Sequence, residues 1–133
     1  METRVEDKKV RDLMTYGVVT IPEYSKVAGV VDVLVEGHVH GIVVTNKKSD
    51  MEGVISEIDI TKACDKNFEE IKVIDIMSSP VKTIGIDESI RAAGEIMKNE
   101  RINRLVVVDE NKKMRGILSV TDIINEIYRI HRA

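Results

Sequence analysis

Short apolar runs and helical apolar stripes alternate along this chain, and the whole series occurs twice. The first series predicts an extended run at 18–21, a helix over 27–35, a hairpin formed by 42–45 and 53–55, and a helix over 57–65. The second predicts an extended run at 81–84, a helix over 90–97, a hairpin formed by 105–108 and 116–118, and a helix over 120–131. Each series therefore has the order β-α-β-β-α.

The two series are copies of one another. A shift of 63 residues aligns 9–60 with 72–123 without a gap. Identical pairs occur at the openings of the copies, in the extended runs, in the hairpins and in the last helices: Val10 and Val73, Asp12 and Asp75, Met14 and Met77, Val18 and Val81, Gly53 and Gly116, Ser56 and Ser119, and Asp59 and Asp122. A repeat that runs through the whole chain indicates two structural units of the same kind.

Two copies are too few for a solenoid, so we expect a pair that shares one core. The expected fold is mixed α/β (of the α+β type), with two tandem β-α-β-β-α motifs packed with pseudo-twofold symmetry. We place the first motif at 1–66 and the second at 67–133, because the charged segment 66–72 links the copies.

Composition narrows the class of protein. Apolar residues make up 43% of the chain and charged residues 32%, which is typical of a globular protein. The net charge of −3 does not favour nucleic acid or an anionic membrane as a partner. The first residues are charged and lack the apolar stretch of a signal peptide, so we expect a cytoplasmic protein.

The residues best suited to bind a ligand lie where the last strand of each copy meets its helix. Ser119 and Asp122 stand three residues apart there, as do Ser56 and Asp59 in the first copy. The amides of a helix N-terminus are unpaired donors with a partial positive charge, which suits a phosphate. The same spacing also fits a capping box, and the two roles are compatible.

Patterns typical of enzymes and metal sites are missing from the sequence. It contains no Walker lysine loop, no H-E-x-x-H and no nucleophile–base pair, so we do not expect an enzyme. His38 and His40 could share one face of an extended segment, but two imidazoles do not complete a zinc site. We therefore expect a surface loop there and no metal.

The twofold β-α-β-β-α plan, the Met-Thr/Ser opening of each copy and its closing Gly-x-x-Ser-x-x-Asp-Ile resemble the cystathionine-β-synthase (CBS) domain family. A tandem pair of such motifs is called a Bateman module. The segments 103–111 and 116–122 are similar to the nucleotide-binding repeats of the AMP-activated kinase γ subunit. The resemblance covers most of the chain.

This resemblance implies an adenosine-containing ligand in the cleft between the repeats. Asp122 would accept hydrogen bonds from the ribose hydroxyls, Ser119 and Thr121 would meet phosphate oxygens, and Arg104 would bind phosphate. The openings of the two copies would wall the adenine, each crossing to the Asp of the other copy. The implied main site comprises Thr15, Val18, Arg104, Ile117, Ser119, Thr121 and Asp122.

The implied second site comprises Ser56, Asp59, Ser78 and Val81. The first copy has Gly41 where the second has Arg104, and Ile58 where the second has Thr121. We therefore expect this second site to bind phosphate more weakly, to stay empty, or to take a less charged adenosine compound.

The expected function is that of a stand-alone regulatory module. It would bind AMP, ADP, ATP or S-adenosylmethionine as a regulatory ligand, with no catalytic cofactor, and signal to an effector protein. We also expect a homodimer, because Ile124 and Tyr128 form a second apolar stripe on the last helix. The alternative is a structural or adaptor homodimer with vestigial ligand clefts.

Overall fold

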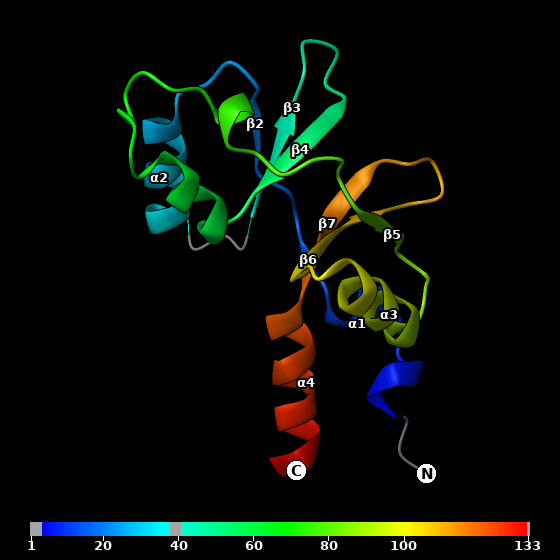
Figure 1. The fold of residues 1–133 in the computed structure, drawn as a ribbon. Helices are drawn as coiled ribbons and strands as arrows, with labels where there is room; N and C mark the ends of the chain where they lie inside the picture. Colours follow the sequence, from blue (N-terminus) through cyan, green and yellow to red (C-terminus); the bar gives the residue numbers. More distant parts are fainter. Residues whose placement is uncertain (1–3, 38–40, 133) are drawn as a thin grey trace. The chain divides into compact units, whose positions relative to one another are not determined.

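The computed structural model of the chain describes residues 4–37 and 41–132. These residues form two compact units (Figure 1). Val18–Val81 make up one, which we call the middle unit. Met1–Gly17 and Lys82–Ala133 make up the other, which we call the terminal unit. The start of the first copy therefore folds with the second copy, and the segment before β5 (Thr83–Gly85) folds with the first.

The middle unit consists of a three-stranded sheet, one α-helix and two 3-10 helices. Its elements are β2 (Thr20–Pro22), α2 (Val27–Glu36), β3 (Ile42–Thr45), β4 (Met51–Ile55), η2 (Glu57–Ala63) and η3 (Val73–Asp75). The strand order is β2-β3-β4, with β2 parallel to β3 and β3 antiparallel to β4. The crossover through α2 permits the parallel pair, and a tight turn permits the antiparallel one.

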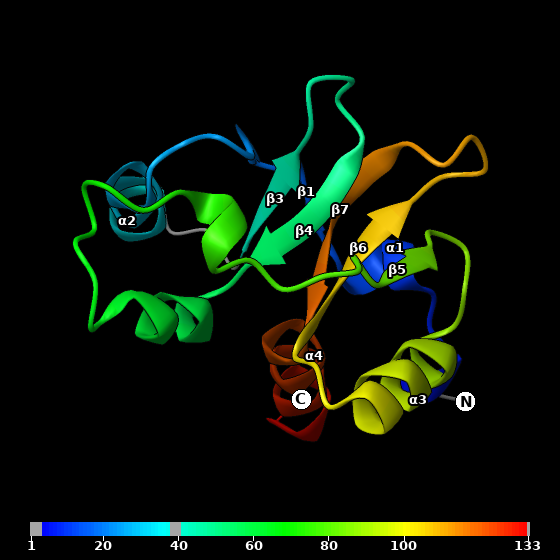
Figure 2. The same ribbon diagram turned by 45° about the horizontal axis from the view of Figure 1, so that its top comes forward.

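The terminal unit repeats this plan and adds a fourth strand. Its elements are η1 (Val5–Asp7), α1 (Val10–Leu13), β1 (Thr15–Tyr16), β5, α3 (Ile90–Glu100), β6 (Arg104–Val108), β7 (Met114–Ser119) and α4 (Val120–Arg132). The strand order is β1-β7-β6-β5, and Figure 2 shows β1 beside β7. In the middle unit a single bridge between Val54 and Ser78 stands in the place of β1.

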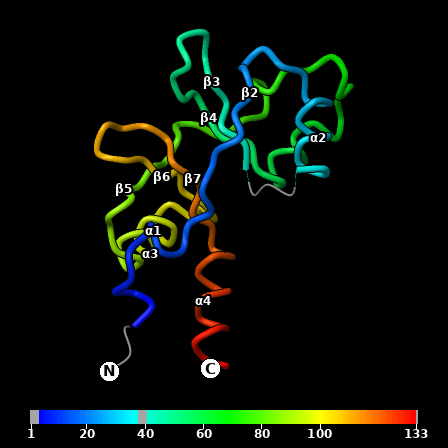
Figure 3. The backbone as a smooth tube through the Cα atoms, turned by 180° about the vertical axis from the view of Figure 1, so that it is seen from behind, coloured from blue at the N-terminus to red at the C-terminus, as the bar shows by residue number. Residues whose placement is uncertain are grey.

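Each unit has its own apolar core. Ile42, Val44 and Ile55 of the middle unit's sheet are fully buried with Val27 and Val30 of α2. The corresponding core of the terminal unit includes Val10 and Met14 from the start of the chain as well as residues of the second copy, among them Leu105, Val107 and Leu118. The N-terminal segment therefore completes the core of the terminal unit, where Figure 3 shows it beside α3.

These observations confirm the mixed α/β class and the β-α-β-β-α order of both copies. One expected helix has a different form, since 57–63 is a 3-10 helix. Helix propensity does not explain the difference, because the start of α4 has at least as many β-branched residues, namely Val120, Thr121, Ile123 and Ile124. The matching segment α4 is a regular α-helix of 13 residues.

Candidate functional site

Ser119 and Asp122 form a reciprocal pair at the junction of β7 and α4. The Ser119 amide donates to Oδ2 of Asp122 at 2.9 Å, and the Asp122 amide donates to Oγ of Ser119 at 3.2 Å. This is a capping box, so the structural interpretation of the motif is correct here. The capping box uses Oδ2 of Asp122, and Oδ1 takes no part in it.

The second oxygen of Asp122 faces the start of the chain. The Thr15 hydroxyl donates to Oδ1 of Asp122 at 3.4 Å, a long contact between residues 107 positions apart. Thr15 reaches this place because β1 pairs with β7, where Thr15 lies opposite Ile117. That pairing requires Gly116, because a Cβ there would overlap the Thr15 carbonyl oxygen.

Arg104 belongs to the same neighbourhood. It begins β6 and lies opposite Ser119 in the β6–β7 register. Thr121 is exposed in the first turn of α4, whereas Ile117 is buried in β7. The terminal unit therefore contains Thr15, Arg104, Ile117, Ser119, Thr121 and Asp122, while Val18, the remaining residue of the expected main site, belongs to the middle unit.

The middle unit carries an equivalent cluster around Asp59, in which the contact from Ser78 is shorter than that of Thr15 with Asp122. The Ser56 amide donates to Oδ2 of Asp59 at 2.9 Å, and the Ser56 hydroxyl donates to the same atom at 3.2 Å. The Ser78 hydroxyl donates to Oδ1 at 2.8 Å. Val81 ends the same unit. Asp59 is only 2% exposed, so this carboxylate is enclosed by its own chain.

Lys62 is the residue of this cluster that the sequence analysis missed. Its Nζ lies 2.9 Å from Oδ1 of Asp59 and donates to the Ile76 carbonyl at 3.1 Å. The signal was the Asp-x-x-Lys spacing, because residues three apart in a 3-10 helix lie above one another. Burial disfavours ionisation of Asp59, but donors from Ser56, Lys62 and Ser78 outweigh it and hold the pKa of Asp59 below its ordinary value.

The other departures of the first copy are also visible. Gly41 precedes β3, so no side chain stands where Arg104 stands in the terminal unit. Ile58 is 69% exposed at the start of η2, where α4 presents Thr121. The middle unit therefore offers an exposed apolar side chain at the position where the terminal unit offers a hydroxyl.

The possible metal ligands His38 and His40 lie outside the described residues. Within 4–37 and 41–132, no three His, Cys, Asp or Glu side chains are grouped so that they could hold a metal ion. Nor does any helix in that part of the chain have the length and apolar character needed to cross a membrane.

Comparison with known proteins identifies the family. The CBS domain model matches this chain twice, over residues 10–66 and 73–129. The chain therefore belongs to the CBS domain family and carries a tandem pair of CBS domains. Both matches span the strand-to-helix junctions that hold Asp59 and Asp122.

Solved CBS structures share the fold. A CBS domain protein from Pyrobaculum aerophilum, complexed with AMP, is 25% identical and covers 92% of this chain and 99% of its own, with a TM-score of 0.78. A CBS domain pair in complex with 5′-methylthioadenosine and S-adenosyl-L-methionine is 23% identical and covers 90% of this chain and 95% of its own, with a TM-score of 0.79.

Among curated sequences, an uncharacterized protein of Methanopyrus kandleri is 37% identical over 91 residues, which are 64% of this chain and 46% of that protein. The chain spans less than half the length of the first curated relatives it matches.

Proposed function

We propose that this tandem CBS pair is a regulatory module that binds an adenosine-containing ligand, with Asp122 as the group that accepts the ribose hydroxyls. The observation that carries the proposal is the state of the Asp122 carboxylate. Its Oδ2 accepts one amide hydrogen bond and its Oδ1 one long hydroxyl contact. A carboxylate has about four acceptor positions, so Asp122 retains capacity for a diol.

The surroundings of Asp122 support a ligand that also carries charge. The first turn of α4 presents backbone donors and the exposed Thr121 hydroxyl, which suit phosphate oxygens. Arg104, across from Ser119, adds a guanidinium that can bind phosphate through two donors. The AMP complex of the Pyrobaculum aerophilum relative supports the same class of ligand.

Regulation would follow from a shift between conformations of the module. A ligand changes the population of two states only if it binds one of them more tightly. We propose that a bound adenosyl compound favours one state and that an effector protein responds to this state. In this proposal the CBS pair supplies binding, and its own residues perform no chemical step.

The test is isothermal titration calorimetry of the purified protein with AMP, ADP, ATP and S-adenosylmethionine, on the parent and on Asp122→Ala. We expect binding of at least one of them in the parent, weakened about tenfold or more in the variant, because a charge-assisted hydrogen bond is worth about 1.5–3 kcal/mol. Glu110→Ala, in the exposed turn before β7, is the matched control and should bind like the parent.

Flat titrations with all four compounds would contradict the proposal and favour the adaptor alternative. Equal affinities of the parent and Asp122→Ala would also contradict it, because the ligand would then be held somewhere else. Circular dichroism of both proteins should accompany the titrations, since Asp122 also caps α4 and its loss could loosen that helix.

A further inference from the structure

The two CBS motifs of this chain have the same residues at their strand-to-helix junctions but different states of the key carboxylate. Asp59 is enclosed by four donors: the amide and the hydroxyl of Ser56, the hydroxyl of Ser78 and the ammonium of Lys62. A carboxylate offers about four acceptor positions, so those of Asp59 are filled from within the chain.

The donors of a ribose would therefore have to displace existing contacts of Asp59. The contact from the Ser56 amide belongs to the local capping geometry, and Asp122 has its counterpart in the Ser119 amide. The Lys62 contact is different, because it adds a full positive charge to a carboxylate whose side chain is 3% exposed. Nζ of Lys62 also donates to the Ile76 carbonyl, so two hydrogen-bond acceptors fix the position of the ammonium beside Asp59.

Asp122 differs from Asp59 in this respect. The residue that corresponds to Lys62 is Asn125, which carries no charge. Among the residues that the structure describes, no cation forms an ion pair with Asp122. The Thr15 hydroxyl stands 3.4 Å from Asp122, whereas its counterpart in the middle unit, Ser78, stands 2.8 Å from Asp59. The Asp122 site is therefore the looser and less neutralised one.

We infer that Lys62 acts as a built-in substitute for ligand at Asp59, so that the chain binds one adenosyl ligand, at Asp122, and not two. Lys62 is then the residue that determines which of the two duplicated sites is available. This inference rests on the proposed function for its ligand. It turns the open expectation about the second site into a definite one, with a single side chain as the cause.

The experiment exchanges residues between the two copies at the positions of Lys62 and Asn125. Lys62→Asn frees Asp59 from its cation, and Asn125→Lys places an ammonium three residues after Asp122. Lys62→Arg keeps the charge at Asp59, and Asn125→Gln keeps the position near Asp122 neutral. Each protein is titrated with AMP by calorimetry to obtain stoichiometry and affinity.

We expect one AMP per chain in the parent, in Lys62→Arg and in Asn125→Gln. Lys62→Asn should bind a second equivalent, and Asn125→Lys should bind AMP about tenfold or more weakly, because its Asp122 is engaged by the new ammonium. Two equivalents in the parent would overturn the inference. So would a single equivalent in Lys62→Asn, or a loss of binding in that variant, which would make Lys62 a ligand contact.

A ligand-free measurement separates this inference from the proposed function. The carboxyl carbon of Asp59, followed by NMR against pH, should titrate at lower pH in the parent than in Lys62→Asn. If the parent binds none of the adenosyl compounds while this difference is present, the proposed function fails and the Lys62–Asp59 pair stands. If the Asp59 titration is the same in both proteins, Lys62 does not engage the carboxylate and the inference fails.

Discussion

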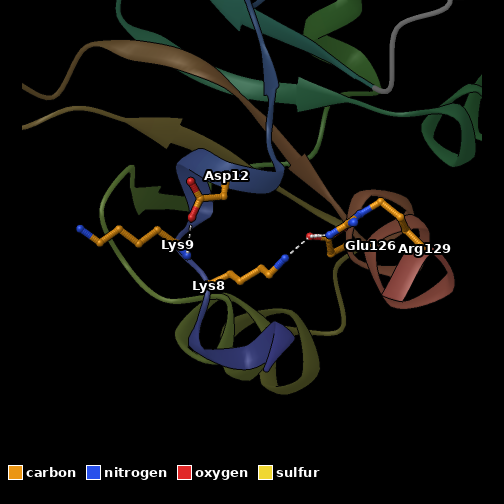
Figure 4. Close-up of polar contacts among 5 residues, drawn as sticks. All are labelled: Lys8, Lys9, Asp12, Glu126 and Arg129. Carbon is orange, nitrogen blue, oxygen red and sulfur yellow. Dashed lines mark hydrogen bonds and ion pairs between the residues drawn. The ribbon is translucent and has the colours of Figure 1, made fainter. Parts of the chain in front are cut away.

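Glu126 shows how one side chain ties distant parts of the terminal unit together. Its carboxylate accepts from Lys8 near the start of the chain and from Arg129 on its own helix, as Figure 4 shows. The Lys8 and Glu126 side chains are only 20% and 14% exposed, so solvent screens this pair less than the other ion pairs of the unit. Hydrogen bonds from Arg129 and Lys8 lower the pKa of Glu126 from 4.5 to about 2.

A carboxylate with a lowered pKa in the folded state stabilises the fold above its unfolded pKa, and this contribution fades as pH falls through the folded pKa. Glu126→Gln should therefore be less stable than the parent near neutral pH. The difference in the free energy of unfolding between the two proteins should shrink as pH falls from about 4.5 to about 2. Urea denaturation at a series of pH values measures it.

Glu95→Gln is the matched control for this prediction. Glu95 pairs with Lys98 on α3, but both side chains are more than half exposed, and such pairs contribute about 0–1 kcal/mol. A difference between the parent and Glu126→Gln that stays constant across the acid range would contradict the prediction. A loss no larger than that of Glu95→Gln at neutral pH would contradict the role of the Lys8 contact.

At the level of elements, the two repeats differ in how the N-terminus of their first helix is capped. α3 begins at Ser89, whose hydroxyl accepts from the Ala92 amide at 3.1 Å. The corresponding residue of α2 is Lys26, which makes no side-chain cap. Both residues have the same extended backbone, with φ/ψ of −77°/156° for Ser89 and −84°/150° for Lys26.

The repeat therefore predicts opposite effects of two substitutions. Ser89→Ala should cost about 1 kcal/mol of stability, because it leaves the Ala92 amide without its acceptor. Lys26→Ser should increase the stability of the middle unit by up to about 1 kcal/mol, because it supplies the cap that α2 lacks. Chemical denaturation measures both.

Lys26→Ala is the control for the second substitution, since it removes the lysine without adding an acceptor. If Lys26→Ala stabilises the protein as much as Lys26→Ser, the gain does not come from capping. If Ser89→Ala unfolds at the same denaturant concentration as the parent, the hydrogen bond seen at α3 contributes nothing measurable.

For the whole molecule, the question is what covers the outer face of α4. Ile124, Ile127 and Tyr128 are 56%, 50% and 61% exposed on that helix, although all three are large apolar side chains. Val120 and Ile123, in the first turns, pack against the core of the terminal unit. We propose that a second copy of the chain covers this face, because an apolar stripe of this kind is typical of a protein interface.

Gel filtration with light scattering tests the proposed dimer. The parent should have about twice the 15.0 kDa mass of one chain, and Ile124→Lys with Tyr128→Lys should shift it to the mass of one chain. Ile58→Lys is the control, because Ile58 is exposed in the middle unit and is not part of α4. A parent of 15.0 kDa mass, or a dimer that survives the double substitution, would contradict the proposal.

The repeat, the order of the elements and the hydroxyl–carboxylate pair at each junction follow from the sequence alone. These features depend on periodicity and on residues three positions apart, which local geometry places in a known way. The same local rules misjudged 57–65, where 57–63 is a 3-10 helix although the matching start of α4 has at least as many β-branched residues.

Contacts between distant residues required the tertiary structure. Periodicity does not reveal that Thr15 lies against β7 or that Ser78 lies against β4, although the family resemblance implied that these segments cross. Both contacts rely on glycine at positions 53 and 116, where a side chain would collide with the neighbouring backbone. The Lys8–Glu126 pair spans 118 residues, a separation at which no local pattern carries a signal.

The difference between the two carboxylates also became visible only in three dimensions. Asp59 and Asp122 have the same local motif, and the sequence comparison judged their sites by Arg104 and Thr121. The charge that distinguishes them comes from Lys62, and its effect depends on the burial of Asp59, on Ser78 and on the Ile76 carbonyl. The number of acceptor positions that a carboxylate has left for a ligand depends on all the donors around it, near and far in the sequence. Duplicated motifs can therefore fold alike and still differ in what they bind.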